Sequence, residues 1–464
     1  MAPAWPLVAC LIVGAASLVV PAAPGYDAWS WLIWGREVAA LDLETAEGPA
    51  WKPLPVAVTS VLAVLAGDAA PELWLVLARA GAALAVVEAF RLARRLGGGS
   101  LAAGAVSAVG VLFLENWVWH AAVGNAEGIL AALALAAVRH LLDGRLERAF
   151  WLAGAAALIR VEVWPFVTVL GLVVGTHVPA TRLRLLAAAL AVPTLWFLPD
   201  LLASGDALRS FERARVPNPG APALAERPAW EALSRAAGLS LPALLVGAAG
   251  AAALGTGLSE RSRAARRIAA PAALGVVWAA TVAAMSEVGF SGEERYLLPA
   301  AVLVTVSGGP GLALVGRRAV AGTARGRLAA ALLLLTAALL TAPAASSRVE
   351  ALGLQRERLA HADALSVNLG ATVRILGSRE RVEACGRPWV GRFRAPVLAW
   401  TLGVHKARVG LEPGASGVLF RSRLHPTAPL EPPVPAGFRR ATGPASTRDG
   451  WEVWRACAAS RPKS

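Results

Sequence analysis

Charged residues are scarce in this chain: only 16% of its 464 residues are Asp, Glu, Lys or Arg, whereas 56% are hydrophobic. This composition excludes an ordinary soluble protein of two or three domains. Apolar runs of membrane-spanning length recur up to about residue 344, and they predict a polytopic membrane protein. Only the residues after about 345 have a soluble composition. We therefore expect a membrane domain over residues 1–344 and a soluble domain over residues 345–464.

Cysteine is rare as well, with three residues in the whole chain. Cys10 lies inside the first apolar segment, whereas Cys385 and Cys457 both belong to the C-terminal region. Their spacing matches no zinc-binding pattern, so a zinc site is not expected. If the C-terminal region lies outside the cytoplasm, Cys385 and Cys457 can form a disulfide that closes a long loop.

Three other features are missing from the sequence. No basic stretch precedes the apolar segment 7–20, so we expect an uncleaved first helix instead of a signal peptide. No nucleic-acid-binding motif accompanies the net charge of +14, and we expect no nucleic-acid partner. No internal repeat is visible, which weighs against a transporter built from two related halves.

Much of the positive charge lies in arginine clusters between the apolar segments, as in cytoplasmic loops. Five clusters fall on one face of the membrane if the chain crosses it about eleven times, and they lie at residues 91–95, 139–148, 182–184, 261–267 and 317–327. This topology places the N-terminus in the cytoplasm and the C-terminal domain outside. Within that domain we expect a helix over 348–369 and strands near 373–376, 418–420 and 451–455, which make a small α/β fold.

The first loop on the outer face, residues 25–55, contains four tryptophans and a single lysine. Asp27 follows the first apolar segment closely. A carboxylate at the outer mouth of a membrane cavity can act as a general base, because partial burial raises its pKa towards a useful value. The alternative is that Asp27 only caps a helix beside the membrane. Trp29 and Trp51 could stack on sugar faces or anchor the loop among lipid headgroups.

Further polar residues are predicted on the same face. Lys52 and Arg295 could bind a lipid phosphate, with Tyr296 beside them, although each of the three could be an ordinary interface residue. Glu127 begins a helix, where a carboxylate also favours the helix dipole. A second group of polar residues lies within an apolar run: Arg160 and Glu162, followed by Pro165, interrupt it. Such a break is tolerated where it lines a cavity, and its two charges could contact substrate or form a structural ion pair.

Two stretches of the first loop resemble the GT-C superfamily of polytopic membrane glycosyltransferases. They are Gly25–Tyr26–Asp27–Ala28–Trp29 and Trp51–Lys52–Pro53–Leu54–Pro55, the second followed by a short apolar helix. The resemblance covers about residues 5–345 and is strongest to bacterial mannosyl- and arabinosyltransferase-like members. It implies an all-α polytopic fold and inverting transfer of a hexose or pentose from a polyprenyl-phosphate sugar.

The same resemblance implies the roles of two carboxylates. Asp27 takes the place of the catalytic base, and Glu127 that of a second acidic position where aspartate is more usual. Some members use a divalent metal, but two carboxylates without a clear ligand set assign none here. The implied acceptor is a glycan, lipid or protein of the cell envelope, and the implied location is a bacterial plasma membrane.

Two rival functions remain open at this point. A transporter or flippase of a lipid-linked substrate would use the same charges within the membrane, and broken helices occur in both classes. A scaffold for envelope assembly that has lost catalysis would keep the same architecture. The long first loop and the soluble C-terminal domain favour an enzyme.

Overall fold

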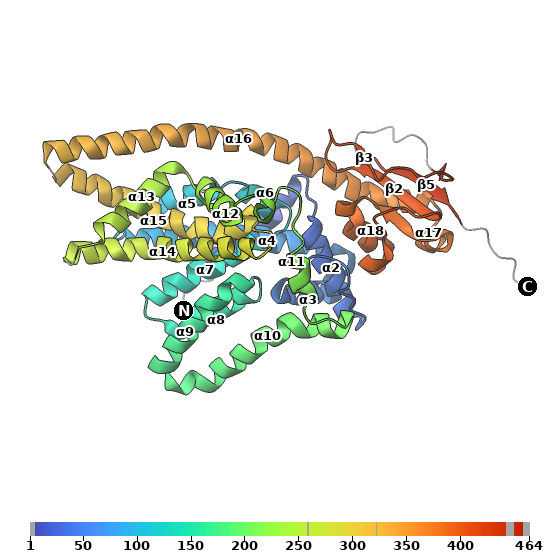
Figure 1. Cartoon of the computed structure of the whole chain (residues 1–464), viewed down its shortest axis with the longest axis horizontal. Coiled ribbons are helices and arrows are strands. Elements are labelled where there is room, and N and C mark those ends of the chain that lie inside the picture. Colours follow the sequence, from blue (N-terminus) through green and yellow to red (C-terminus); the bar gives the residue numbers. More distant parts are fainter. Residues whose placement is uncertain (1–4, 258, 322, 442–449, 458–464) are drawn as a thin grey trace, which may run out of the picture.

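A computed structural model describes residues 5–257, 259–321, 323–441 and 450–457, and it is helical over most of that length. The helices of the membrane part are α1 Trp5–Ala16, α2 Tyr26–Ala39, α3 Pro53–Ala66, α4 Ala70–Leu96, α5 Leu101–Leu112, α6 Trp117–Ala122, α7 Glu127–Leu142, α8 Leu146–Ala157, α9 Trp164–His177, α10 Arg182–Ser204, α11 Arg209–Ala214, α12 Pro228–Leu239, α13 Pro242–Leu254, α14 Glu260–Glu287 and α15 Glu294–Ala321. The next helix, α16 Ala324–Ile375, leads to the C-terminal domain at the right of Figure 1.

Five stretches of the described chain are helical, long and apolar enough to cross a membrane, namely Pro53–Leu96, Pro179–Ser204, Ser262–Glu287, Glu294–Ala321 and Ala324–Ile375. A sixth arises if α12 and α13, which meet at a bend of 104°, count as one span. Other predicted crossings are shorter apolar helices, such as α5. The polytopic helical fold expected from the sequence is confirmed, whereas the number of about eleven crossings stays a prediction.

The centre of the membrane part is formed by α4, α7 and α15. Small residues let these helices approach closely, as is usual between membrane helices. At Gly128, a Cβ atom would lie only 2.7 Å from the backbone of Ala82. The close approach of α7 to α4 therefore depends on this glycine, and it fixes the position of the neighbouring Glu127 at the start of α7.

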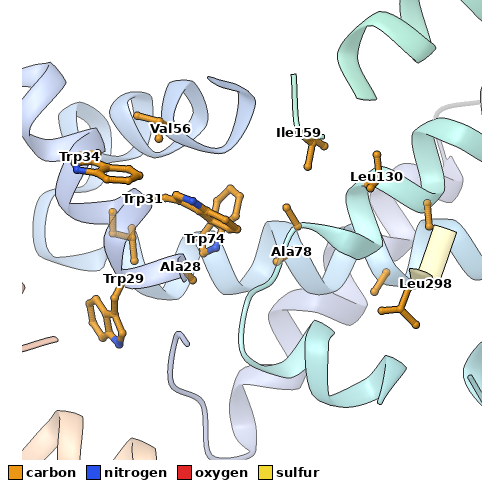
Figure 2. Packing of buried hydrophobic residues seen from close by; sticks show 14 of the residues in the cluster. Ala28, Trp29, Trp31, Trp34, Val56, Trp74, Ala78, Leu130, Ile159 and Leu298 are labelled. Carbon is orange, nitrogen blue, oxygen red and sulfur yellow. The ribbon is translucent and has the colours of Figure 1, made fainter. Parts of the chain in front are cut away.

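A group of buried tryptophans holds the first loop against the membrane helices. Figure 2 shows Trp31 of α2 beside Trp74 of α4, and their ring centroids are 5.6 Å apart in an edge-to-face arrangement. Trp34 packs on Trp51 with ring centroids 5.5 Å apart and the ring planes tilted by 44°. Aromatic pairs of this kind add to the free energy gained by burial. The segment 25–55, expected as a loop, therefore contains the buried helix α2.

The predicted break in the apolar pattern is confirmed. Helix α8 ends at Ala157 and α9 begins at Trp164, with a short 3₁₀ turn, Val161–Val163, between them. Pro165 occupies the first turn of α9, where its missing N–H leaves no backbone acceptor unsatisfied. The backbone N–H of Leu54 donates to the carbonyl of Leu158 at 3.0 Å. This bond fastens the start of α3 beside the break.

The described part of the C-terminal domain contains helices α17 and α18 and a small sheet, which confirms the expected α/β fold. Its elements are α17 Arg379–Cys385, β1 Pro388–Val390, α18 Ala395–Leu402, β2 Gly417–Arg423, β3 Leu430–Glu431, β4 Arg439–Arg440 and β5 Glu452–Ala456. The strand order is β1-β2-β5-β4, with β3 on β2; only β1 and β2 run parallel. A disulfide joins Cys385 to Cys457.

Two of the three strands expected in this domain are present. Residues 418–420 lie in β2 and residues 452–455 in β5. The strand expected near 373–376 is wrong, because residues 373–375 belong to the last turn of α16. Val373 is buried there by helix packing, and an apolar run this short does not distinguish a strand from a helix. The expected boundary between residues 344 and 345 falls inside α16, which is continuous.

Candidate active site

A pocket of about 410 Å³ lies where the first loop, the break between α8 and α9, and the C-terminal domain meet. Its lining comes from the start of α2, the segment before α3, the break, α10, α11, the end of α14, the start of α15 and the turn before α18. The structure thus brings together most of the residues that the sequence singled out: Asp27, Lys52, Arg160, Glu162, Arg295 and Tyr296 all line this pocket.

Asp27 lies in the first turn of α2, where the helix dipole favours a carboxylate. The backbone N–H of Gly25 donates to the carbonyl of Val123 at 2.8 Å, which fixes the start of the helix. The guanidinium of Arg295 donates to the Asp27 carboxylate at 2.7 Å and to Glu293 at 2.9 Å. Asp27 is 8% exposed, so this charge-assisted pair is largely shielded from water.

The pKa of Asp27 differs from the sequence-based expectation. Burial raises the pKa of this carboxyl, as expected, but the positive charges of Arg295 and Lys52 and the hydrogen bond from Arg295 outweigh the burial and lower it below its usual value. The expectation of a raised pKa was therefore wrong, because the sequence does not show which cation lies against Asp27. The carboxylate is ionised and able to accept a proton.

Lys52 immediately precedes α3 and is 7% exposed. Its ammonium lies 5.1 Å from the centre of the Trp31 ring, and it makes no hydrogen bond or ion pair with any residue that the structure describes. Burial lowers the pKa of Lys52 to about 8, and the nearby charge of Arg160 acts in the same direction. A buried cation without an anionic partner is a ready site for a phosphate.

Arg160 is held on several sides. Its guanidinium donates to Glu127 at 3.1 Å and to Glu162 at 3.0 Å, and it lies 3.8 Å from the centre of the Tyr296 ring. These contacts brace the break between α8 and α9, which is the structural alternative considered for Arg160 and Glu162. Glu127 is 2% exposed and lies behind Arg160, outside the pocket lining. Its contact with the pocket is therefore made through Arg160.

The two tryptophans proposed as sugar platforms lie elsewhere. Trp29 packs on Trp400 of the C-terminal domain, with ring centroids 5.9 Å apart. Trp51 packs on Trp34, and its ring N–H donates to the carbonyl of Leu195 at 3.0 Å. Neither lines the pocket. Both hold the first loop against its neighbours.

Other residues of the pocket were not found from the sequence. One wall is apolar and follows α9, α10 and α14, with Trp164, Phe197 and Met285 among its members. Arg213 of α11 and Arg392 before α18 also line the pocket. We call this part of the pocket, next to the C-terminal domain, its outer end, because the topology predicted from the sequence places that domain outside the cytoplasm. Arginines in loops carry no periodic signal, and only the fold shows that these two approach the same space.

The carboxylates that line the pocket, and Glu127 behind it, are paired with arginines. Asp27 is bound to Arg295, and both Glu127 and Glu162 are bound to Arg160. Within the part of the chain that the structure describes, no group of three or more His, Cys, Asp or Glu residues is placed to hold a metal ion. This donor set does not fit a divalent cation, and we derive no step through one.

Comparisons with known proteins agree with this architecture. No family model matches the chain, and no curated relative matches it. The chain is similar to the crystal structure of ArnT from Cupriavidus metallidurans bound to undecaprenyl phosphate, with a TM-score of 0.57 at 15% identity over 99% of each chain. It is also similar to ArnT in the apo state, with a TM-score of 0.56 at 14% identity over 97% of this chain and 96% of that one. At this identity the likeness shows the fold alone. The chain shares the polytopic helical fold of these structures.

Proposed function

We propose that this chain is an integral membrane glycosyltransferase that moves a sugar from a polyprenyl-phosphate donor to an acceptor of the bacterial cell envelope, with inversion. The observation that carries the proposal is the pocket itself. It combines an ionised carboxylate, Asp27, with a buried cation, Lys52, and an apolar wall along α9, α10 and α14. The likeness to ArnT, whose structure holds undecaprenyl phosphate, supports a polyprenyl phosphate as the carrier lipid.

Each part of the donor has a matching surface in the pocket. The polyprenyl chain lies along the apolar wall, because burial of its methyl and methylene groups there is favourable. The phosphate binds the ammonium of Lys52 and the remaining N–H groups of Arg295. The sugar then lies over Asp27, at the outer side of the phosphate.

The reaction is a direct displacement at the anomeric carbon. The oxygen of the acceptor hydroxyl attacks the anomeric carbon while the bond between that carbon and the phosphate oxygen breaks. The electron pair of the broken bond leaves with the polyprenyl phosphate. Asp27 takes the proton of the attacking hydroxyl. A bound phosphate also competes with Asp27 for Arg295, and weakening that ion pair raises the pKa of the carboxyl and makes it a stronger base.

The test compares wild type with Asp27→Asn in reconstituted membranes, using labelled sugar on a panel of polyprenyl-phosphate donors and envelope acceptors. Loss of a general base costs about a hundredfold to ten-thousandfold in rate, so we expect Asp27→Asn to lose transfer by at least this factor. Asp68→Asn, at an exposed turn between α3 and α4, is the matched control and should transfer normally.

Three results would decide between the alternatives. Transfer by wild type and its loss in Asp27→Asn, with normal folding of the variant, supports both the class of enzyme and the base. Full transfer by Asp27→Asn would exclude Asp27 as the base. Donor binding by wild type without transfer to any acceptor would favour a flippase or a scaffold.

A further inference from the structure

We propose that the outer end of the pocket binds an anionic group of the acceptor, through Arg213 of α11 and Arg392 of the C-terminal domain. The inference rests on the proposed glycosyltransferase function. It gives the C-terminal domain a direct role in selecting the acceptor. The acceptor it selects carries a phosphate next to the hydroxyl that receives the sugar.

The first observation is the placement of Arg392. It begins the 3₁₀ turn Arg392–Arg394 that precedes α18, and its side chain is exposed on the pocket side of the C-terminal domain. The next residue, Phe393, contacts Tyr26 of α2 edge to face, with ring centroids 6.2 Å apart. Because Tyr26 directly precedes Asp27, this contact fixes the turn next to the proposed base.

The second observation is that Arg213 faces the same space from another element. Its guanidinium donates to the carbonyl of Val216 at 2.9 Å, which directs the side chain along the end of α11. The pKa of Tyr26 is raised to about 12 by burial and by the negative charges of Asp27 and Glu47, while the positive charges of Arg213 and Arg392 both oppose that rise; Glu47 itself is paired with Lys406 at 3.4 Å. Both guanidinium groups are therefore close enough to act on the Tyr26 side chain, and both residues line the pocket.

The third observation is the contrast with the pocket floor. Arg160 and Arg295 are each paired with two carboxylates there. Neither Arg213 nor Arg392 forms an ion pair with any residue that the structure describes, whereas the carboxylates that line the pocket, Asp27, Glu162 and Glu293, are each paired with Arg295 or Arg160. The outer end thus has an excess of positive charge, with N–H donors available to an anion.

One donor molecule cannot bind both pairs of cations, Lys52 with Arg295 and Arg213 with Arg392. A polyprenyl-phosphate sugar carries one phosphate, and Lys52 with Arg295 accounts for it at the floor. The sugar separates this phosphate from the outer end of the pocket. An anion at Arg213 and Arg392 must then belong to the molecule that arrives from outside, which is the acceptor.

The test uses the full-length protein in nanodiscs of zwitterionic lipid and measures binding by tryptophan fluorescence. Glycerol 3-phosphate and dihexanoyl phosphatidylglycerol are the acceptor probes, because both place a hydroxyl near a phosphate; glycerol is the neutral control. Farnesyl phosphate is the donor probe. The soluble and lipid probes distinguish a free phosphate ester from a lipid headgroup as the source of the anion.

We expect Arg392→Gln to weaken binding of at least one acceptor probe by about tenfold or more, as for loss of a charge-assisted contact, while farnesyl phosphate binds unchanged. Arg392→Lys should recover part of the affinity because it keeps the charge. Lys52→Met should show the reverse pattern. Arg439→Gln, on exposed β4 of the same domain, is the matched control and should match wild type.

Two outcomes would overturn the inference. One is that the acceptor probes bind wild type no better than glycerol does, and the other is that they bind Arg392→Gln as tightly as wild type. Either result leaves farnesyl phosphate binding as an independent readout. If that probe binds and depends on Lys52, the acceptor subsite fails but the donor site stands. If it does not bind, the proposed function fails first.

Discussion

At the scale of single residues, we expect binding of the proposed donor to depend most on the ammonium of Lys52. Arg160 and Arg295 already satisfy carboxylates, so a donor phosphate must compete for them. The ammonium of Lys52 lies 5.1 Å from the centre of the Trp31 ring and makes no ion pair with any described residue, although the negative charges of Glu127 and Asp27 act on it from further away. A phosphate that reaches it replaces no ion pair, and the full attraction contributes to binding.

This argument gives a prediction on pH. Burial lowers the pKa of Lys52 to about 8, so the lysine is charged below that pH and becomes neutral above it. A polyprenyl-phosphate sugar is a phosphodiester that keeps one negative charge throughout this range. We therefore expect the affinity for the donor to fall as the pH rises from about 7 to 10, as measured by titration with a labelled short-chain donor.

The control for this experiment is Lys52→Arg, which keeps its charge at every pH in the range. Its affinity for the donor should stay nearly constant between pH 7 and pH 10. An equal loss of affinity in both proteins would show that another group titrates, and would remove Lys52 from the phosphate site.

The sequence identifies residues of this kind only where a local pattern singles them out. Asp27 and Lys52 stand in a loop beside the membrane, and Arg160 interrupts an apolar run, so all three were found. Arg213 and Arg392 stand in ordinary polar segments. They line the same pocket although 179 positions separate them in the sequence, so only the fold shows that they share it. For the same reason the lowered pKa of Asp27 could not be predicted, since Arg295 reaches it from 268 residues away.

At the scale of elements, the helix that carries Asp27 is held from outside by the C-terminal domain. Arg36, near the end of α2, donates to the carbonyls of Trp400 at 3.1 Å and Val404 at 3.0 Å. Its guanidinium also lies 5.0 Å from the centre of the Trp400 ring. These carbonyls belong to the C-terminal end of α18 and the turn after it, where a helix runs out of backbone donors; the Trp400 carbonyl also accepts the backbone N–H of Gly403 at 3.1 Å.

Removal of this contact should affect both stability and transfer. Arg36→Ala leaves the Val404 carbonyl without its side-chain donor, leaves the Trp400 carbonyl with only the backbone N–H of Gly403, and removes a cation from the Trp400 face. We expect this loss to cost about 2 kcal/mol. The thermal unfolding midpoint should fall, and the maximal transfer rate should fall with it, because α2 is then less firmly held beside the pocket. Thermal scans and initial rates on the reconstituted protein measure the two effects.

Arg381→Ala, at an exposed position of α17 in the same domain, is the matched control and should leave both quantities close to wild type. If Arg36→Ala unfolds and transfers like wild type, the C-terminal domain does not position α2. A lowered midpoint with an unchanged rate would limit Arg36 to a structural role.

At the scale of the whole molecule, α16 links the two ends of the structure. It starts beside the end of α15 at the left of Figure 1 and runs the length of the molecule to the C-terminal domain at the right. The periodicity of the sequence predicted its last part as a helix over 348–369, but not its continuity with the apolar span before it. The change from apolar to polar composition near residue 344 was interpreted as a boundary, whereas the backbone continues through it as one helix.

The arrangement of charge gives the last prediction, which concerns orientation. Arg317 and the basic cluster around it lie at the end of α15, far along α16 from the pocket and the C-terminal domain. Short basic loops stay in the cytoplasm, so the pocket should open to the outside.

A cysteine in place of exposed Glu412 in the C-terminal domain should react with a membrane-impermeant maleimide in intact cells. A cysteine in place of exposed Arg317 should react only after the membrane is opened. Cys10 is buried and the other two cysteines are joined in a disulfide, so the background should be low. The opposite labelling pattern would place the pocket in the cytoplasm, where an acceptor of the outer envelope cannot reach Asp27.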